Sequence, residues 1–443
     1  MRRTVLLAMA GAAAAAAVAL FAMRRARHAT PPGGAPLAAP ADSTPPSLAH
    51  LAPASDEVVT EAEGSPVPGL DLLHVATDSD TATAPAHGGT AHLTLDSDLQ
   101  RTARALMAAH HVPEAAVVLM DVATGRLLVY ASHVDDGPLR DLCAEATAPS
   151  ASVFKIVTSA ALIEDAHLGP DTRKCYWGGE QRITLADLVD DPARDRWCAT
   201  LAGALGRSIN TVFARLAEQR LTPRQLEAMA RRFGYGEPLA FDVPVQPNAL
   251  RIPSEPLEFA RTAAGFWNTT LSPLEAAEMS AIVARGGEAV RPRVVDEVVS
   301  PAGAAVWTAP AAPATRRVVE HDTADDLTRM MEHTISEGTS FRAFHDGRGR
   351  PYLPGIGVAG KTGTLTDYSS QRYYTWFTGF APARPEAGVP RVAVAALVVN
   401  GPVWQVKANV LARDVLRAFF ASRGIRGVSR PAFTSVARHH RRR

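Results

Sequence analysis

The sequence predicts an α+β fold, in which an antiparallel sheet is flanked by helices and accompanied by an all-helical subdomain. Two apolar runs, residues 115–120 and 126–132, are joined by a turn that ends at Gly125, and this pattern is typical of a hairpin. Helix signals fill the middle of the chain, and apolar strand-like runs return late, notably at 391–400. Because strands occur at both ends of the folded region, we expect them to join one antiparallel sheet.

The predicted helices are defined by their terminal signals. Asp96 or Ser97 caps the first helix, and Thr222-Pro223 opens another that ends at Gly234. Ser272-Pro273-Leu274-Glu275 combines a capping box with proline at the first helical position, and this helix ends at Gly286-Gly287. Two further helices are predicted at residues 323–336 and 405–420.

The N-terminal residues 1–27 are predicted to anchor the chain in a membrane. An apolar run of 19 residues, Val5 to Met23, lies between arginines and is just long enough to span a bilayer. Alanine dominates the run, so a cleaved export signal is the alternative, and Arg2-Arg3 also resembles a twin-arginine signal. We favour an uncleaved single-pass anchor.

Three further segments follow the anchor. Residues 28–92 are rich in Pro, Ala, Ser, Thr and Gly and are predicted to form a flexible linker. Residues 93–425 are predicted to form the folded domain, and residues 426–443 a basic tail. The formal net charge is only +1, and nucleic acid is not an expected partner of a domain held outside the cytoplasm.

Lysine is rare in this chain, and two of its four lysines lie in motifs typical of catalytic sites. Lys155 closes the S-x-x-K motif Ser152-Val153-Phe154-Lys155, and Lys361 opens Lys361-Thr362-Gly363-Thr364. The S-x-N motif Ser208-Ile209-Asn210 lies between them. A partly buried lysine can lose its proton and act as a base, whereas the arginines that carry charge elsewhere cannot.

The chemistry of a serine nucleophile explains these residue types. On a helix, Ser152 and Lys155 lie one turn apart on the same face, and burial lowers the proton affinity of the lysine. Ser208 can relay a proton, and the amide of Asn210 can hold a substrate carbonyl. Lys361, Thr362 and Thr364 supply a charge and hydroxyls suited to a peptide carboxylate, while Gly363 leaves room for a substrate along the strand.

These motifs, in this order, resemble those of penicillin-binding proteins, a family of serine acyltransferases. The similarity covers about Leu93 to Phe420 and is carried by four segments: 149–155, 208–213, 358–364 and 376–382. The resemblance implies the penicillin-binding, β-lactamase-like transpeptidase fold, with Ser152 as nucleophile and Lys155, Ser208 and Lys361 as further catalytic residues. It also implies an oxyanion hole formed by the backbone N–H groups of Ser152 and Thr364.

The resemblance further implies a periplasmic, class B-like serine D,D-transpeptidase that cross-links peptidoglycan stem peptides ending in D-Ala-D-Ala. Such an enzyme binds β-lactams covalently, works with a glycosyltransferase partner, and needs no cofactor or metal. Three alternatives remain open: a D,D-carboxypeptidase, a class D-like β-lactamase, and a non-catalytic β-lactam sensor or divisome scaffold. A class D β-lactamase usually carries an aliphatic residue where Asn210 stands here.

The three cysteines fit an exported protein. Cys175 and Cys198 flank the segment before Ser208, and an oxidising compartment permits a disulfide between them. Cys143 then stays unpaired; the alternative is three buried free thiols. The histidine pairs His110-His111 and His439-His440 lack partners at metal-ligand spacing, so no metal site is expected.

Overall fold

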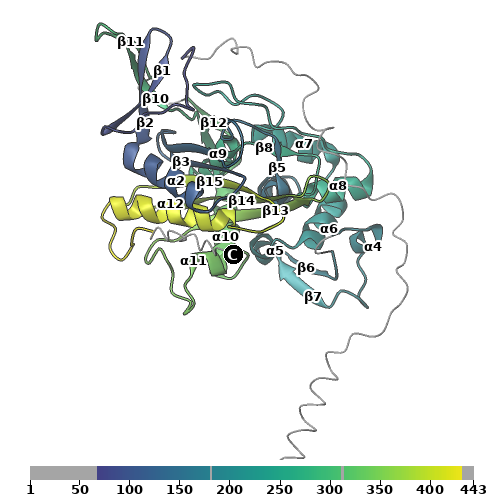
Figure 1. Ribbon diagram of the computed structural model, residues 1–443. Coiled ribbons are helices and arrows are strands. Elements are labelled where there is room, and N and C mark those ends of the chain that lie inside the picture. The colour runs from purple at the N-terminus through teal and green to yellow at the C-terminus, as the bar shows by residue number, and fades with distance from the viewer. Residues whose placement is uncertain (1–66, 180–181, 311–313, 432–443) are drawn as a thin grey trace, which may run out of the picture. The chain divides into compact units, whose positions relative to one another are not determined.

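The structure is a computed structural model that describes residues 67–179, 182–310 and 314–431 (Figure 1). The predicted anchor (1–27), the first part of the predicted linker (28–66) and the end of the basic tail (432–443) lie outside the described residues. Within the described ranges, no helix is both long enough and apolar enough to cross a bilayer.

A five-stranded antiparallel sheet forms the centre of the fold, in the order β13-β14-β15-β3-β4. Strands β3 (Glu114–Asp121) and β4 (Leu127–Val134) are the predicted N-terminal hairpin. Strands β13 (Ala359–Asp367), β14 (Arg372–Ala381) and β15 (Val392–Asn400) come from the end of the chain. The two groups meet where β15 pairs with β3, which confirms the predicted α+β fold and leaves β13 at the edge.

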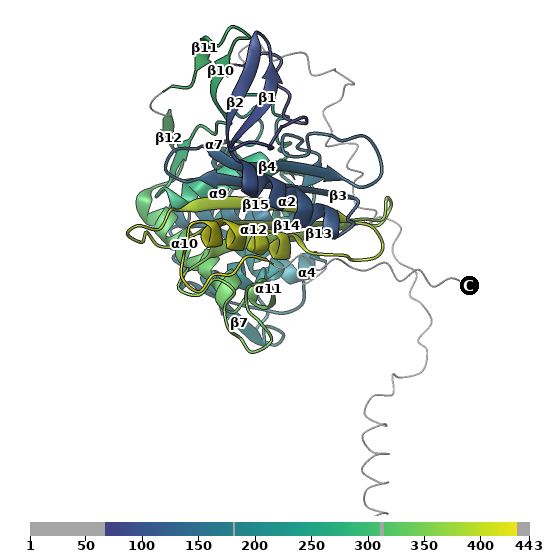
Figure 2. The same cartoon turned by 60° about the vertical axis from the view of Figure 1, so that its left-hand side comes forward.

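Apolar cores cover both faces of this sheet. Successive residues of β3 point to opposite sides, so that Val117 and Leu119 belong to one core while Val118 and Met120 belong to the other. On the first face, α2 (Ser97–Ala109) lies beside α12 (Ala408–Ser422), as Figure 2 shows. The short α11 (Phe341–Phe344) packs on α12, and α9 (Pro273–Ala284) packs on the opposite face.

The helical part of the fold lies on the α9 side of the sheet and contains seven further helices. Their bounds are α3 (Lys155–Glu164), α4 (Leu185–Leu188), α5 (Leu201–Arg207), α6 (Asn210–Arg220), α7 (Pro223–Arg232), α8 (Pro256–Ala263) and α10 (His321–Ser336). Thr222 forms a capping box with Gln225. Ser272 accepts a hydrogen bond from the backbone of Glu275, but its own N–H donates to Asn248 Oδ1, so the predicted capping box there is only half formed.

A small hairpin borders the helical part, formed by β6 (Arg173–Tyr176) and β7 (Trp197–Thr200). Cys175 and Cys198 pair across it and form a disulfide, whereas Cys143 is a buried free thiol. Two other short pairs join β5 (Ala148–Pro149) to β8 (Thr270–Leu271), and β9 (Glu288–Val290) to β12 (Thr315–Arg317).

The linker prediction is wrong for residues 67–92, because this segment folds. Strands β1 (Thr81–Ala86) and β2 (Gly89–Asp96) form a hairpin, and β2 also pairs with β10 (Val295–Val299), which in turn pairs with β11 (Ala305–Thr308). The buried face of β1 and β2 includes alanines 82, 84 and 91. Alanines carry little signal for a strand. The strand that pairs with β2, β10, follows only about 200 residues later in the sequence.

Candidate active site

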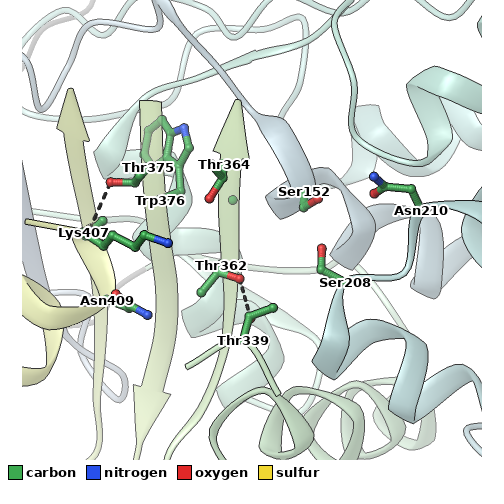
Figure 3. Close-up of a pocket in the computed structure, with 12 residues that line it drawn as sticks. Ser152, Ser208, Asn210, Thr339, Thr362, Thr364, Thr375, Trp376, Lys407 and Asn409 are labelled. Atoms are coloured by element: carbon green, nitrogen blue, oxygen red, sulfur yellow. Dashed lines mark hydrogen bonds between the residues drawn. The ribbon is translucent and has the colours of Figure 1, made fainter. Parts of the chain in front are cut away.

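A cleft of about 340 Å³ brings together residues from all three motifs (Figure 3). One wall carries Ser152, Ser208 and Asn210, and the other is the edge strand β13 with β14 and the start of α12 behind it. Twelve residues line the cleft: Ser152, Ser208, Asn210, Thr339, Thr362, Gly363, Thr364, Thr375, Trp376, Lys407, Ala408 and Asn409. The structure therefore assembles residues that are more than 200 positions apart in the sequence.

Ser152 lies in a tight 3₁₀ turn, η2 (Ala151–Phe154), which leads directly into α3. The preceding residue, Ala151, has a left-handed backbone with φ of 48°, which is a strained conformation for alanine. Two glycines make room for this turn. A Cβ on Gly265 would lie 2.4 Å from the carbonyl oxygen of Ala151, and one on Gly363 would lie 3.2 Å from the Ala151 Cβ.

Lys155 is fully buried behind Ser152. Its Nζ lies 2.7 Å from Ser152 Oγ, 2.7 Å from Asn210 Oδ1 and 2.7 Å from the carbonyl oxygen of Ala264. Burial lowers the pKa of Lys155 well below its usual value, and the charge of Lys361 lowers it further. A neutral amine has two N–H groups, which the oxygens of Asn210 and Ala264 can accept. Its lone pair is then directed to the hydroxyl of Ser152.

Ser208 connects the two motif lysines. It ends α5 in a left-handed conformation with φ of 58°, and Asn210 begins α6 two residues later. Ser208 Oγ lies 3.0 Å from Lys361 Nζ and 3.4 Å from Lys155 Nζ. A proton can therefore pass between Lys155 and the cleft through this hydroxyl.

Lys361 is arranged differently from the sequence-based expectation. Its side chain is fully buried, and its Nζ donates to Ser208 Oγ and, at 2.7 Å, to the carbonyl oxygen of Thr362. Burial lowers the pKa of Lys361 to about 7. The lysine that the sequence assigned to a substrate carboxylate thus contacts the hydroxyl of Ser208 from behind and does not line the cleft.

The other residues of the third motif face the cleft. Thr364 is exposed, and Thr362 shares a 2.6 Å hydrogen bond with the hydroxyl of Thr339. Gly363 is favoured by close packing, since a Cβ there would lie 3.1 Å from Trp376 Cβ and 3.2 Å from Ala151 Cβ. The predicted oxyanion donors belong to Ser152 and Thr364, and both residues line the cleft.

Several groups that form this site were not identified from the sequence. The carbonyl of Ala264 and the close approach of Gly265 follow no motif, and they are set by the turn after α8. Lys407 and Asn409 come from the start of α12. The rarity of lysine in this chain was a usable signal for Lys407. Among the described residues, no group of three or more His, Cys, Asp or Glu side chains could hold a metal ion.

Comparison with known proteins agrees with this geometry. Residues 115–417 match the family model described as the penicillin binding protein transpeptidase domain. The chain is 26% identical over 358 residues to stage V sporulation protein D of Bacillus subtilis, covering 76% of this chain and 53% of that protein. It is 30% identical over 279 residues to the peptidoglycan D,D-transpeptidase PbpA of Mycobacterium tuberculosis, covering 60% of this chain and 52% of that protein. The chain thus spans about half the length of these curated relatives.

Solved structures show the same fold. The D,D-transpeptidase domain of a peptidoglycan glycosyltransferase from Eggerthella lenta aligns with a TM-score of 0.61 at 27% identity, covering 75% of this chain and 83% of that one. Penicillin-binding protein 3 of M. tuberculosis in complex with aztreonam aligns with a TM-score of 0.61 at 24% identity, covering 77% of this chain and 81% of that one.

Proposed function

Because this chain belongs to the penicillin-binding protein transpeptidase family, we propose that it is a serine D,D-transpeptidase that cross-links peptidoglycan stem peptides. One observation carries the proposal: Lys155 Nζ lies 2.7 Å from Ser152 Oγ, in a buried site that lowers its pKa. A serine paired with a desolvated amine is an activated nucleophile. The names of the matched relatives, which include a peptidoglycan D,D-transpeptidase, support peptidoglycan as the substrate.

The proposed reaction begins when Lys155 accepts the proton of Ser152 and Oγ attacks the carbonyl carbon of the penultimate D-alanine. The oxyanion is stabilised by the backbone N–H groups of Ser152 and Thr364. Collapse of the intermediate breaks the peptide bond. The proton passes from Lys155 through Ser208 to the leaving nitrogen, and D-alanine departs. An amine of a neighbouring stem peptide then attacks the ester carbonyl and gives up a proton to Lys155. The bond between the carbonyl carbon and Oγ breaks, and the proton passes from Lys155 to Oγ, which restores Ser152.

A β-lactam enters the same pathway, since its amide carbonyl acylates Ser152. Hydrolysis by a class D-like mechanism requires a carbamylated lysine in an apolar pocket. Here Lys155 Nζ is held by the polar oxygens of Asn210 and Ala264, which disfavours that state. We therefore expect a long-lived acyl-enzyme. A D,D-carboxypeptidase would use the same residues with water as the acceptor.

The cellular setting is part of the proposal. A tether at residues 1–27 would hold the domain at the outer face of the cytoplasmic membrane, where peptidoglycan is assembled. A glycosyltransferase that supplies nascent glycan strands would be the protein partner.

Covalent labelling by a fluorescent penicillin tests the proposed function. We expect mass spectrometry to find one adduct per chain, on the peptide that contains Ser152. Ser152→Ala should lose the adduct and keep its thermal midpoint, because this small cleft hydroxyl contributes little to packing. Labelling that persists in the variant would assign the nucleophile elsewhere, and rapid multiple turnover of penicillin would favour a β-lactamase.

A further inference from the structure

The buried position of Lys361 leaves a question about substrate recognition. A peptide that ends in D-Ala-D-Ala carries a carboxylate one residue beyond the bond that is cut. Lys155 and Lys361 are both fully buried and do not line the cleft, and their Nζ atoms lie behind the polar groups that do. The motif residues that line the cleft therefore present hydroxyl and amide groups, without a full positive charge.

Lys407 supplies a charge in the same cleft. It is exposed, and among the twelve residues that line the cleft in the described part of the chain, it alone carries a full charge. Figure 3 shows its side chain extending from the start of α12 across β14 toward Thr362 and Thr364. Lys174 pairs with Asp190 at 2.7 Å, whereas no carboxylate of the described residues lies within 4.0 Å of Lys407 Nζ.

The backbone around Lys407 is held in place, unlike that of an ordinary surface lysine. The buried amide of Asn400 binds both sides of the preceding loop: Oδ1 accepts from the backbone N–H of Gln405 at 2.9 Å, and Nδ2 donates to the carbonyl of Val406 at 3.0 Å. On the other side, the N–H of Ala408 donates to Thr375 Oγ1 at 3.1 Å. Thr375 pairs with Thr364 across β14 and β13, so these bonds fix Lys407 relative to the third motif.

The side chain of Lys407 is positioned as well. Its Nζ lies 5.2 Å from the centre of the Trp404 ring, within the range of a cation–π contact. Trp404 in turn packs against Tyr373 of β14, with ring centres 5.6 Å apart. A cation that is already oriented loses less conformational entropy when it binds an anion.

We propose that Lys407 determines specificity for the terminal carboxylate of the donor peptide, which it binds together with the hydroxyls of Thr362 and Thr364. The proposal rests on the proposed transpeptidase function and adds the charged group that selects the substrate. Lys407 is assigned to the carboxylate beside the scissile bond, because Lys407 and the two threonines line one continuous cleft with Ser152. Peptides whose terminal carboxylate is amidated should be poor substrates.

Paired peptide probes test this role. One probe ends in D-Ala-D-Ala with a free carboxylate, and its partner is identical except for a terminal carboxamide. We expect the ratio of their second-order acylation rate constants to fall about 10-fold in Lys407→Gln, mainly through KM, and to be largely kept in Lys407→Arg. Lys174→Gln removes a lysine charge outside the cleft and should keep the ratio of the unmodified protein.

Each other outcome contradicts the assignment. An unchanged ratio in Lys407→Gln, or an equal fall in Lys174→Gln, would remove Lys407 from carboxylate recognition. A third probe keeps the terminal carboxylate and has every other carboxylate amidated. If Lys407→Gln did not slow the acylation of this probe, Lys407 would bind one of the other carboxylates instead. Calorimetric binding of the first two probes to Ser152→Ala, with and without Lys407→Gln, measures the same ratio without turnover. It therefore separates this proposal from a failure of the proposed function.

Discussion

At the scale of single residues, the site depends on where each lysine is placed. Lys155 faces Ser152 from a buried position, Lys361 faces Ser208 from behind, and Lys407 is exposed in the cleft. The same side chain thus occupies three environments. Burial lowers the pKa of the first two, whereas the third is exposed to solvent.

Replacing Lys155 by arginine should be nearly as damaging as replacing it by alanine. Arginine keeps the charge but cannot accept a proton, and the site is fully buried. We expect both variants to lose at least about 100-fold in the rate of penicillin acylation, the usual size of a general-base contribution. Stopped-flow labelling measures this rate, and Lys174→Arg serves as the control. Substantial acylation by Lys155→Arg would show that another group is the base.

The pH dependence of acylation should reveal the coupling between the two buried lysines. The rate should fall toward acid pH, because Lys155 must be neutral to accept the Ser152 proton. Lys361, whose pKa is about 7, lowers the pKa of Lys155 when it is charged. Lys361→Gln removes that repulsion, so the pKa of Lys155 rises and the acid limb should move to higher pH. Rates of labelling from about pH 5 to 9 measure the shift. An unmoved limb would mean that the two charges do not interact.

The motif residues of the site could be predicted from sequence, but their supporting groups could not. Ser152, Lys155, Ser208 and Asn210 were identified because the chemistry fixes their types and order. The carbonyl of Ala264 was missed because every residue has a carbonyl, and only the fold brings this one to Lys155. The role assigned to Lys361 changed because burial is a property of tertiary packing.

At the scale of elements, local signals gave reliable predictions, whereas the distant pairing of β2 with β10 was missed. The caps at Thr222 and Ser272 and the β3–β4 hairpin depend on contacts between near neighbours in sequence, so the pattern is visible in a short window. Ser152 and Lys155 were expected on one helix, but Ser152 lies in a 3₁₀ turn and α3 begins only at Lys155. That difference follows from tertiary contacts, since the left-handed Ala151 packs against Gly265 and Gly363.

Gly265→Ala should therefore impair acylation more than a glycine substitution of similar backbone strain elsewhere. Its φ is 80°, and its new Cβ would also meet the Ala151 carbonyl at 2.4 Å and the Ser152 Cα at 2.9 Å. We expect displacement of the nucleophile and at least about a 10-fold slower acylation. Gly303→Ala is the matched control, since its φ is 82° and nothing lies within 4 Å of the added Cβ. Equal acylation rates in the two variants would show that this contact does not position Ser152.

At the scale of the whole molecule, the fold extends further toward the N-terminus than composition indicates. The four-stranded sheet β1-β2-β10-β11 joins residues 81–96 to residues 295–308, so the segment predicted as linker contributes to the folded unit. The linker prediction from composition was wrong here because an alanine- and threonine-rich strand resembles a linker until its partner strand is known. The catalytic sheet could be predicted because its strands are strongly apolar.

This sheet predicts a difference between two N-terminal truncations. A chain that starts at Val67 keeps β1 and β2, whereas one that starts at Leu93 loses β1 and the first half of β2. The second chain leaves Val298 of β10 without the strand residue, Ala91, with which it pairs. We expect its thermal midpoint to be at least about 1 °C lower, because a loss of even about 1 kcal/mol from broken pairing and exposed apolar surface shifts the midpoint of a domain of this size by roughly that amount. Penicillin labelling below the transition should be similar in both chains, since the cleft residues belong to other elements. Equal midpoints would instead mean that residues 67–92 add no stability, and that the domain boundary near residue 93 holds for folding.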